Sequence, residues 1–161
     1  MDRAAFSHYT EAYQDTVYRV ALNYLGSAAD AEDMVQEVLL RLYTNSKRFT
    51  DADHVKHWLI RVTLNLCSNA VRARKRYDPR PLEDLGCAVA FQTEEQLALY
   101  QSVMALPEKY RTVLYLFYYE DYSVREIARI LHIKDSAVTT RLSRAREQLK
   151  ESLTKEDAYG L

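Results

Sequence analysis

Residues 122–150, YSVREIARILHIKDSAVTTRLSRAREQLK, decide the fold of this chain. Ser123 and Glu126 have the spacing of a capping box, in which each side chain accepts a hydrogen bond from a backbone N–H at a helix start. The pattern predicts a short helix, a turn of three or four residues, and a longer basic helix that Asp135 or Ser136 caps. This order is typical of a helix-turn-helix.

The longer helix of this motif has two different faces. The apolar residues that we expect to face inward are Val138, Leu142, Ala145 and Leu149. The residues left facing outward are Ser136, Ala137, Thr140, Arg141 and Arg144. Short side chains let a helix approach base edges in the major groove, and arginines reach guanine or phosphate. The outer face therefore favours binding to duplex DNA over an ordinary helical hairpin with a solvated basic face.

The sequence before this motif continues the helical pattern. We expect one helix from Glu94 to Leu106 and another from Pro107, a residue favoured at the first helical position, to about Glu120. Residues 77–93 hold two of the three prolines and one of the three glycines. That composition is typical of a linker.

Three more helices are predicted before the linker. Residues 6–24 carry one apolar stripe, which Gly26 ends. Ser27 can cap a second helix, and residues 54–76 form a third. The apolar stripe expected on the third helix is Val55, Leu59, Val62, Leu66 and Ala70. Three helices with a shared apolar interior form a small bundle.

The scarcity of glycine and proline supports the same fold class. Three of each in 161 residues are too few for the tight turns of a sheet-rich fold. We therefore expect an all-α protein of two small helical domains joined by a flexible linker. The expected divisions are a first domain at 1–76, the linker at 77–93 and a second domain at 94–161.

The net charge of -1 hides a strong segregation of charge. Residues 1–53 have a net charge of -4, and residues 54–80 have +6. Residues 81–122 have -5, and residues 123–161 have +2. Segments of opposite sign can present different fields to different partners. A near-zero total is thus compatible with nucleic-acid binding.

Several other classes of protein are disfavoured. The longest apolar run, residues 113–119, is far too short to span a membrane. The N-terminus lacks an apolar signal core, so we expect a cytoplasmic protein. Cys67 and Cys87 form neither a disulfide framework nor a zinc motif, and we expect both to be free thiols.

The helix at 54–76 carries cations and aromatic residues together. Its outer flank holds Arg61, Asn65, Ser68, Arg72 and Arg76. Trp58 lies on the same helix, and Tyr43 and Phe49 precede it. Aromatic rings beside cations suit single-stranded nucleic acid, although Trp58 taken alone is better explained as a core residue.

Several motifs together resemble one family, the extracytoplasmic-function group of bacterial sigma factors within the sigma-70 family. DAEDMVQEV at 30–38 resembles region 2.2, and VKHWLIRVTLN at 55–65 resembles the helix of regions 2.3–2.4. The motifs that resemble region 4 are LPEKYR at 106–111, YYE at 118–120, EIA at 126–128 and TRLSRAR at 140–146. The resemblance covers nearly the whole chain, in order.

This resemblance implies a subunit that docks on core RNA polymerase and has no catalysis, cofactor or metal of its own. In this group the region 2.2 helix binds the β′ clamp helices, and region 4 contacts the β-flap. The residues to which the resemblance gives the clamp-docking role are Asp33, Gln36, Glu37 and Arg41. Members of the group are commonly inhibited by an anti-sigma factor, so such a partner is also implied, without insertion of this chain into a membrane.

The resemblance also implies two contacts with promoter DNA. The region 2.3–2.4 helix holds the melted -10 element, and the loop at 46–54 sets which unstacked base is captured. The residues implied for the -10 element are Lys56, Trp58, Arg61, Asn65 and Arg72. Those implied to read the duplex -35 element are Ser136, Ala137, Thr140, Arg141 and Arg144. The linker would thread toward the RNA exit channel.

Some positions depart from the pattern of the group. Val-Lys stands at 55–56 where Phe-Arg is most common, and Asn69 stands where the group has aspartate. Ser-Ala at 136–137 replaces the usual Gly-Thr. Thr139 replaces a common lysine, which removes the cation of one phosphate contact.

Two other functions compete with this interpretation. A two-domain helix-turn-helix regulator, acting without polymerase docking, would explain residues 94–161 but not the acidic and basic helices before them. An enzyme would need a metal on His54 and His57, with Asp51 and Asp53 nearby, yet a lone histidine pair is usually solvated or faces DNA.

Overall fold

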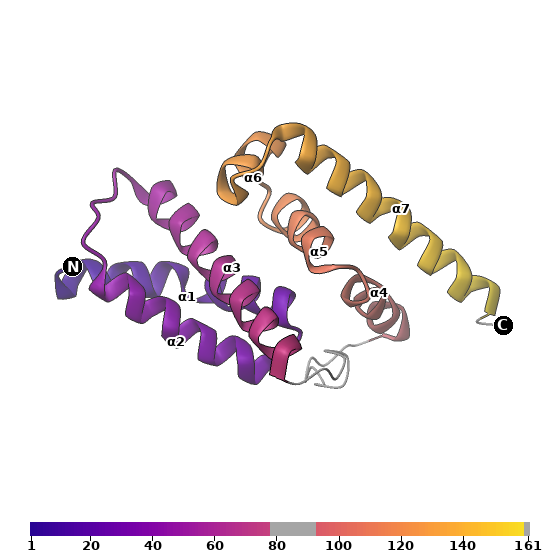
Figure 1. Ribbon diagram of the computed structural model, residues 1–161, viewed down its shortest axis with the longest axis horizontal. Helices are drawn as coiled ribbons and strands as arrows, with labels where there is room; N and C mark the ends of the chain where they lie inside the picture. The colour runs from indigo at the N-terminus through magenta and orange to yellow at the C-terminus, as the bar shows by residue number, and fades with distance from the viewer. Residues whose placement is uncertain (78–92, 160–161) are drawn as a thin grey trace. The chain divides into compact units, whose positions relative to one another are not determined.

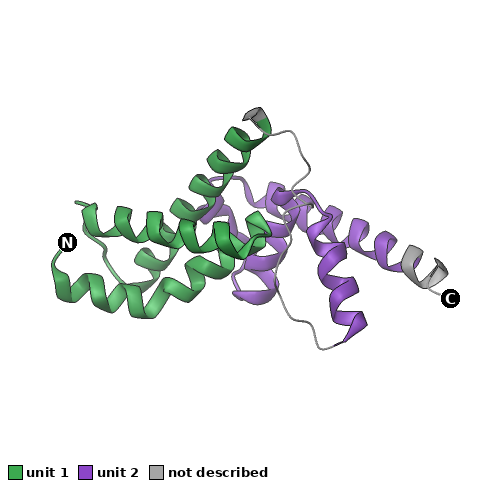
Figure 2. Cartoon of the chain, turned by 90° about the horizontal axis from the view of Figure 1, so that it is seen from below, with its two compact units in different colours: residues 1–88 green, residues 89–161 purple. Residues whose placement is uncertain are grey.

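The structure is a computed structural model that describes residues 1–77 and 93–159, and all regular structure in that part is helical (Figure 1). The chain divides into two compact units, Met1–Ala88 and Val89–Leu161 (Figure 2). The prediction of an all-α fold is confirmed for the described part. The predicted linker lies almost entirely outside the described residues.

Unit 1 is a bundle of three helices: α1 (Arg3–Leu25), α2 (Ala28–Thr44) and α3 (Ala52–Tyr77) (Figure 1). Gly26 ends α1 in the left-handed region, with φ of 70°, and its N–H donates to the carbonyl of Leu22 at 2.8 Å. The hydroxyl of Ser27 accepts a hydrogen bond from the N–H of Asp30 at 3.3 Å. Both predicted caps between α1 and α2 are therefore confirmed, and they make the connection very short.

Two buried clusters hold unit 1 together. The first consists of Val17, Val38, Leu42, Val55 and Leu59. The second consists of Ala21, Leu25, Ala31, Cys67 and Val71. Every helix of the bundle contributes to both clusters, so burial of apolar area links all three helices. Burial also raises the pKa of the Cys67 thiol to about 12, which keeps the thiol protonated and unreactive at neutral pH.

The stripe predicted for α3 is correct at four of its five residues, since Val62 and Leu66 are half-buried and pack against the first buried cluster. Val55 and Leu59 are buried, but Ala70 is exposed. Beyond Leu59 the buried residues of α3 are Ile60, Thr63, Leu64, Cys67 and Val71. The buried face turns around α3 along its length, because its second half packs against the end of α1 and the start of α2. A stripe with fixed spacing could not show this rotation.

Unit 2 contains α4 (Glu94–Met104), α5 (Glu108–Leu114), a π-helical turn η2 (Tyr115–Tyr119), α6 (Val124–Leu131) and α7 (Asp135–Tyr159). The helix predicted from Pro107 to about Glu120 corresponds to the unbroken helical segment of α5 and η2, but it differs in two details. Pro107 occupies the N-cap, one residue before α5, and the second half is the π turn. A π turn inserts a residue into the helical repeat, and apolar spacing in the sequence does not mark it.

A buried arginine connects the first two helices of unit 2. Arg111 is only 6% exposed, and its Nη1 donates to the carbonyls of Met104 and Leu106, each at 2.8 Å. These carbonyls lie at the end of α4, where helical carbonyls lack partners within the helix. The arginine of the LPEKYR motif therefore has a structural role.

The helix-turn-helix is confirmed, with one difference at the start of α7. Ser123 Oγ accepts from the N–H of Glu126 at 3.1 Å, and Glu126 Oε1 accepts from the N–H of Ser123 at 3.2 Å. His132 ends α6 with φ of 55°. Neither predicted residue caps α7, because the helix already begins at Asp135 and the N–H of Ala137 donates to the carbonyl of Lys134.

Candidate nucleic-acid and protein interfaces

The outward residues of α7 line one groove of unit 2. Its volume is about 480 Å³, and all five residues predicted to read duplex DNA line it: Ser136, Ala137, Thr140, Arg141 and Arg144. The structure brings these residues together because Val138, Leu142 and Ala145 anchor the opposite face of α7 in the core. Ser136, Thr140 and Arg144 are exposed, whereas Ala137 and Arg141 are half-buried.

The far wall of this groove contains residues that the sequence analysis missed. They are Lys109 and Tyr110 from α5, with Ile133 and Lys134 from the turn before α7. Four of the nine lining residues are cationic, and none is acidic. Lys109 Nζ lies 5.1 Å from the centre of the Tyr110 ring. Only the LPEKYR motif pointed to Lys109 and Tyr110, and it gave them no role, because their approach to α7 is a tertiary contact.

Arg146 belongs to a different surface of α7. Its Nε donates to the hydroxyl of Tyr118 at 2.6 Å. Its guanidinium carbon lies 5.6 Å from the ring centre of Phe117 and 5.4 Å from that of Tyr118. Arg146 therefore connects α7 to η2 and does not line the groove.

Four of the five residues predicted for the -10 element share one side of α3: Trp58, Arg61, Asn65 and Arg72. With about 100° per residue, these four fall within an arc of about 60°. Lys56 lies outside it, at least about 140° from each of them around the helix axis. Asn65 and Arg72 are exposed, whereas Lys56, Trp58 and Arg61 are half-buried.

Aromatic rings surround the start of this face. The ring of Phe49 lies 5.5 Å from Trp58, 5.3 Å from His54 and 6.1 Å from Tyr9, in edge-to-face geometry. Trp58 packs against the first buried cluster of unit 1 and remains half-buried. The tryptophan thus has one side in the core and another at the surface, which reconciles the two predictions made for it.

Hydrogen bonds hold the loop between α2 and α3. The N–H of Thr50 donates to Nδ1 of His54 at 3.1 Å, and Asp51 Oδ1 accepts from the N–H of His54 at 2.8 Å. His54 therefore uses its Nδ1 lone pair as a hydrogen-bond acceptor. In the described part of the chain, no three His, Cys, Asp or Glu side chains are grouped so that they could hold a metal.

Tyr13 attaches α1 to the start of α3. Its hydroxyl donates to the carbonyl of Ala52 at 3.3 Å. Burial raises the pKa of Tyr13 above its usual value of 10.0, and the charges of Asp53 and Tyr9 raise it further. The phenol therefore stays protonated and keeps this hydrogen bond at neutral pH.

The four residues predicted to dock on polymerase lie along the exposed side of α2. Asp33, Gln36, Glu37 and Arg41 are all exposed, and Arg41 Nε lies 3.1 Å from Glu37 Oε1. Leu40 lies among them and is 58% exposed, a residue that the sequence analysis missed.

None of the helices in the described part has the length and apolarity that crossing a membrane requires.

Family models match both units of the chain. The model described as Sigma-70 region 2 matches residues 10–77. The model described as Sigma-70, region 4 matches residues 96–149. The first match covers most of unit 1, and the second covers most of the described part of unit 2.

Two curated relatives and one solved structure resemble the chain over most of its length. The ECF RNA polymerase sigma factor SigW of Bacillus subtilis (strain 168) is 31% identical over 169 residues, covering 94% of this chain and 90% of SigW. SigM of Mycobacterium tuberculosis (strain H37Rv) is 28% identical over 154 residues, covering 94% of this chain and 79% of SigM. The sigma factor RpoE of Bartonella quintana, solved with the anti-sigma factor NepR, has a TM-score of 0.80 at 20% identity. That match covers 93% of this chain and 97% of RpoE, and it shows a shared fold.

Proposed function

Because this chain belongs to the ECF RNA polymerase sigma factors of the sigma-70 family, we propose that it binds core RNA polymerase and directs initiation at promoters with distinct -10 and -35 elements. The observation that carries this proposal is the similarity to SigW across 94% of the chain, which includes both units. A regulator that acts without polymerase would need only the helix-turn-helix, so this observation does not favour it.

The exposed side of α2 is the surface for core polymerase in this proposal. Asp33, Glu37 and Gln36 offer acceptors to the β′ clamp helices, and Leu40 supplies apolar area at the centre. The ion pair between Glu37 and Arg41 is about half exposed, so both side chains can exchange it for contacts with polymerase at little cost. Region 4 would add a second contact, with the β-flap.

The side of α3 that carries Trp58 is the surface for the melted -10 element. An unstacked base needs an aromatic partner and cations for its phosphates. Trp58 and Phe49 supply the rings, and Arg61 and Arg72 supply the cations. The loop before α3 would determine which base is accepted.

The groove on α7 is the surface for the duplex -35 element. Ser136 and Thr140 lie near the start of α7, where a helix meets base edges in the major groove. Arg141 and Arg144 can reach guanine or phosphate, and Lys109 approaches from α5. We assign Lys109 to a phosphate, because it lies on the wall opposite the recognition helix. It would replace a cation that the family pattern places at position 139.

The remaining assignments follow from family membership. The first domain would extend over residues 1–76, the linker over 77–93 and the second domain over 94–161. The chain would work in the cytoplasm, where the polymerase is, and would leave all catalysis to that enzyme. An anti-sigma factor would control it by covering one or more of the three surfaces, as RpoE of Bartonella quintana is found in complex with NepR.

Reconstitution with core polymerase tests the proposed function. The purified chain is added to core enzyme on genomic DNA, and the 5′ ends of the transcripts are sequenced. We expect new start sites that share a -10 and a -35 element, and core enzyme alone serves as the control. A holoenzyme without new start sites would refute the proposal, and a footprint on duplex DNA without polymerase would favour the regulator.

A further inference from the structure

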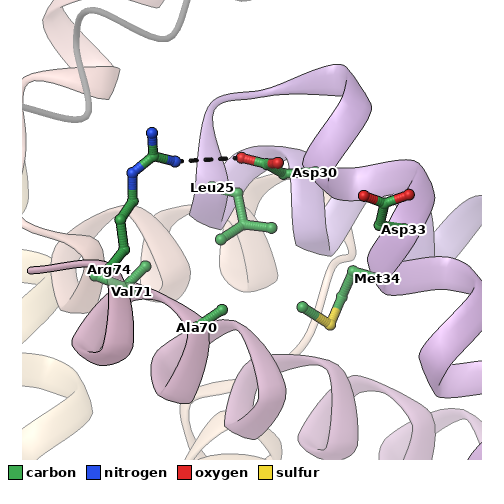
Figure 3. A pocket seen from close by; sticks show the side chains of 7 residues that line it. All are labelled: Leu25, Asp30, Asp33, Met34, Ala70, Val71 and Arg74. Carbon is green, nitrogen blue, oxygen red and sulfur yellow. Dashed lines mark ion pairs between the residues drawn. The ribbon is translucent and has the colours of Figure 1, made fainter. Parts of the chain in front are cut away.

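A cavity of about 300 Å³ opens in unit 1, where the end of α1, the start of α2 and the end of α3 meet (Figure 3). Its apolar lining consists of Leu25, Met34, Ala70 and Val71. Its charged lining consists of Asp30, Asp33 and Arg74. Asp33 also belongs to the docking side of α2, so the cavity continues that surface.

The charges at this cavity do not balance. Arg74 Nη1 lies 3.5 Å from Asp30 Oδ2, and their side chains are 27% and 43% exposed. The exposed Asp33 has no ion pair among the described residues (Figure 3). Two carboxylates and one guanidinium thus line the cavity together with four apolar side chains, and only Asp30 is paired with Arg74. This arrangement attracts a cation that also carries a long hydrocarbon stem.

We propose that this cavity receives one lysine or arginine side chain from the surface of core polymerase that docks on α2; this inference rests on the proposed function. The hydrocarbon stem lies on Met34 and Val71, and the cationic group lies beside Asp30 and Asp33. The volume admits one long side chain. The occupant belongs to polymerase because Asp33 lies on both the docking side of α2 and the rim of the cavity.

Such a side chain would act as the anchor of the interface. Binding energy concentrates where a side chain fills a pocket and loses its water, whereas contacts on a flat exposed face contribute little each. The remaining docking surface of α2 is a convex helix face, and its Glu37–Arg41 pair is about half exposed. The cavity is therefore where we expect a single contact to have the largest effect on affinity.

Filling the cavity tests whether it is occupied. Ala70 is exposed and lines the cavity, so Ala70→Trp can place its ring there without disturbing the core. We expect the affinity of the full chain for core polymerase to fall about tenfold. The matched control is Ala73→Trp, on an exposed residue of the same helix that does not line the cavity. This variant should bind within about twofold of the wild type.

Removing the cation tests the sign of the occupant's charge. Arg74→Met keeps a long apolar side chain and leaves the two carboxylates unopposed. A basic occupant should then bind about threefold more tightly at low salt, whereas an acidic occupant should bind more weakly. Lys75→Met makes the same change in net charge outside the cavity and should have a smaller effect. Thermal unfolding of each variant must show an unchanged folded state.

The outcomes separate this inference from the proposed function. If the wild-type chain does not bind core polymerase, the proposed function fails. The second case is that the wild type binds and that Glu37→Lys weakens binding while Ala70→Trp does not. This result would refute only the proposal that a polymerase side chain occupies the cavity. If Arg74→Met weakens binding although the protein remains folded, a basic occupant is refuted.

Discussion

The groove of α7 and the exposed side of α3 are both basic, but they are built differently. Two elements distant in sequence, α5 and α7, form the walls of the groove, which exists before any ligand arrives. The side of α3 is the convex surface of one helix, and its aromatic residues are partly sunk in the core. Tyr110 is the one aromatic residue that lines the groove, whereas Trp58, Phe49 and Tyr9 gather at the start of α3.

This difference corresponds to the stiffness of the two DNA forms. Duplex DNA is much stiffer than a single strand, so a preformed groove with cations on two walls can match it. A melted strand has flexible phosphates and unstacked bases, so its binding site needs ring faces more than a fixed shape. Substitutions on the two surfaces should therefore differ in which DNA form they affect and by how much.

Truncation of Trp58 should have the largest effect. Trp58→Ala removes a ring on which a base can stack, and stacking contributes about 1–3 kcal/mol per base. We expect initiation by the holoenzyme to fall about 10- to 100-fold. The loss should persist on a template whose -10 region is already single-stranded, because the lost contact is to the open strand.

Two controls separate stacking from stability in that experiment. Trp58→Phe keeps an aromatic ring and should recover much of the activity. Thermal unfolding should be compared among the three proteins, since Trp58 also packs against the core of unit 1. Full activity of Trp58→Ala on the pre-opened template would show that stacking on Trp58 does not contribute to binding of the melted strand.

Truncation of Arg141 should have the next largest effect. A bidentate arginine–base pair discriminates by about 1–3 kcal/mol, so Arg141→Ala should weaken use of the -35 element about tenfold. Binding to core polymerase, measured with the same protein, should not change. Arg146→Ala is the matched control, because Arg146 lies on the same helix but contacts Tyr118. Loss of core binding by Arg141→Ala would show that α7 has been assigned to the wrong ligand.

Substitution of Lys109 tests whether the second wall of the groove matters. We expect Lys109→Ala to weaken promoter binding by the holoenzyme about two- to threefold at moderate salt, equally for different -35 sequences. The slope of log affinity against log salt should become shallower by about 1, as for loss of one phosphate contact. Lys150→Ala, outside the groove, should leave the slope unchanged. An unchanged slope for Lys109→Ala would show that Lys109 contacts no phosphate and that only α7 binds the DNA.

The smallest effect concerns Cys67, and it appears only at high pH. The folded pKa of about 12 exceeds the ordinary value of 9.0, so the folded state holds its proton more tightly than the unfolded state. The free energy of unfolding should therefore be unaffected by this group below pH 9 and should decrease between pH 9 and about 12. Denaturant unfolding, compared with Cys67→Ala across this range, measures the effect.

Labelling gives an independent measure of the same burial. In a Cys87→Ser background, a thiol reagent should label Cys67 at neutral pH only after denaturation. Rapid labelling of the native protein would contradict the placement of Cys67 between α1, α2 and α3.

Local sequence signals predicted most of the helices and several of their ends. Gly26, Ser27 and the Ser123–Glu126 capping box act within four residues along the chain, so their effects are visible without a fold. The outer face of α7 was predicted for the same reason, because helical periodicity alone sorts its arginines from its core residues.

Features that depend on contacts between distant residues were not predicted. The buried face of α3 rotates because different helices cover its two halves. Regular spacing therefore predicted that Ala70 is buried, whereas it is exposed. The π turn at 115–119 and the cap of α7 were also missed. Lys56 is a different case, because it was grouped with Trp58 from a family pattern although helical periodicity already places the two on different sides.

The all-α class, the order of the helices, the segregation of charge and the family all follow from the amino-acid sequence alone. Periodicity and capping act over a few residues, and motifs are read along the chain, so these features needed no tertiary contact. The packing of helices against one another is what places Lys109 in the groove of α7 and brings Arg74 to Asp30 beside a cavity. Those residues come together through packing of separate helices, and the geometry of packing is not encoded in any single stretch of the chain.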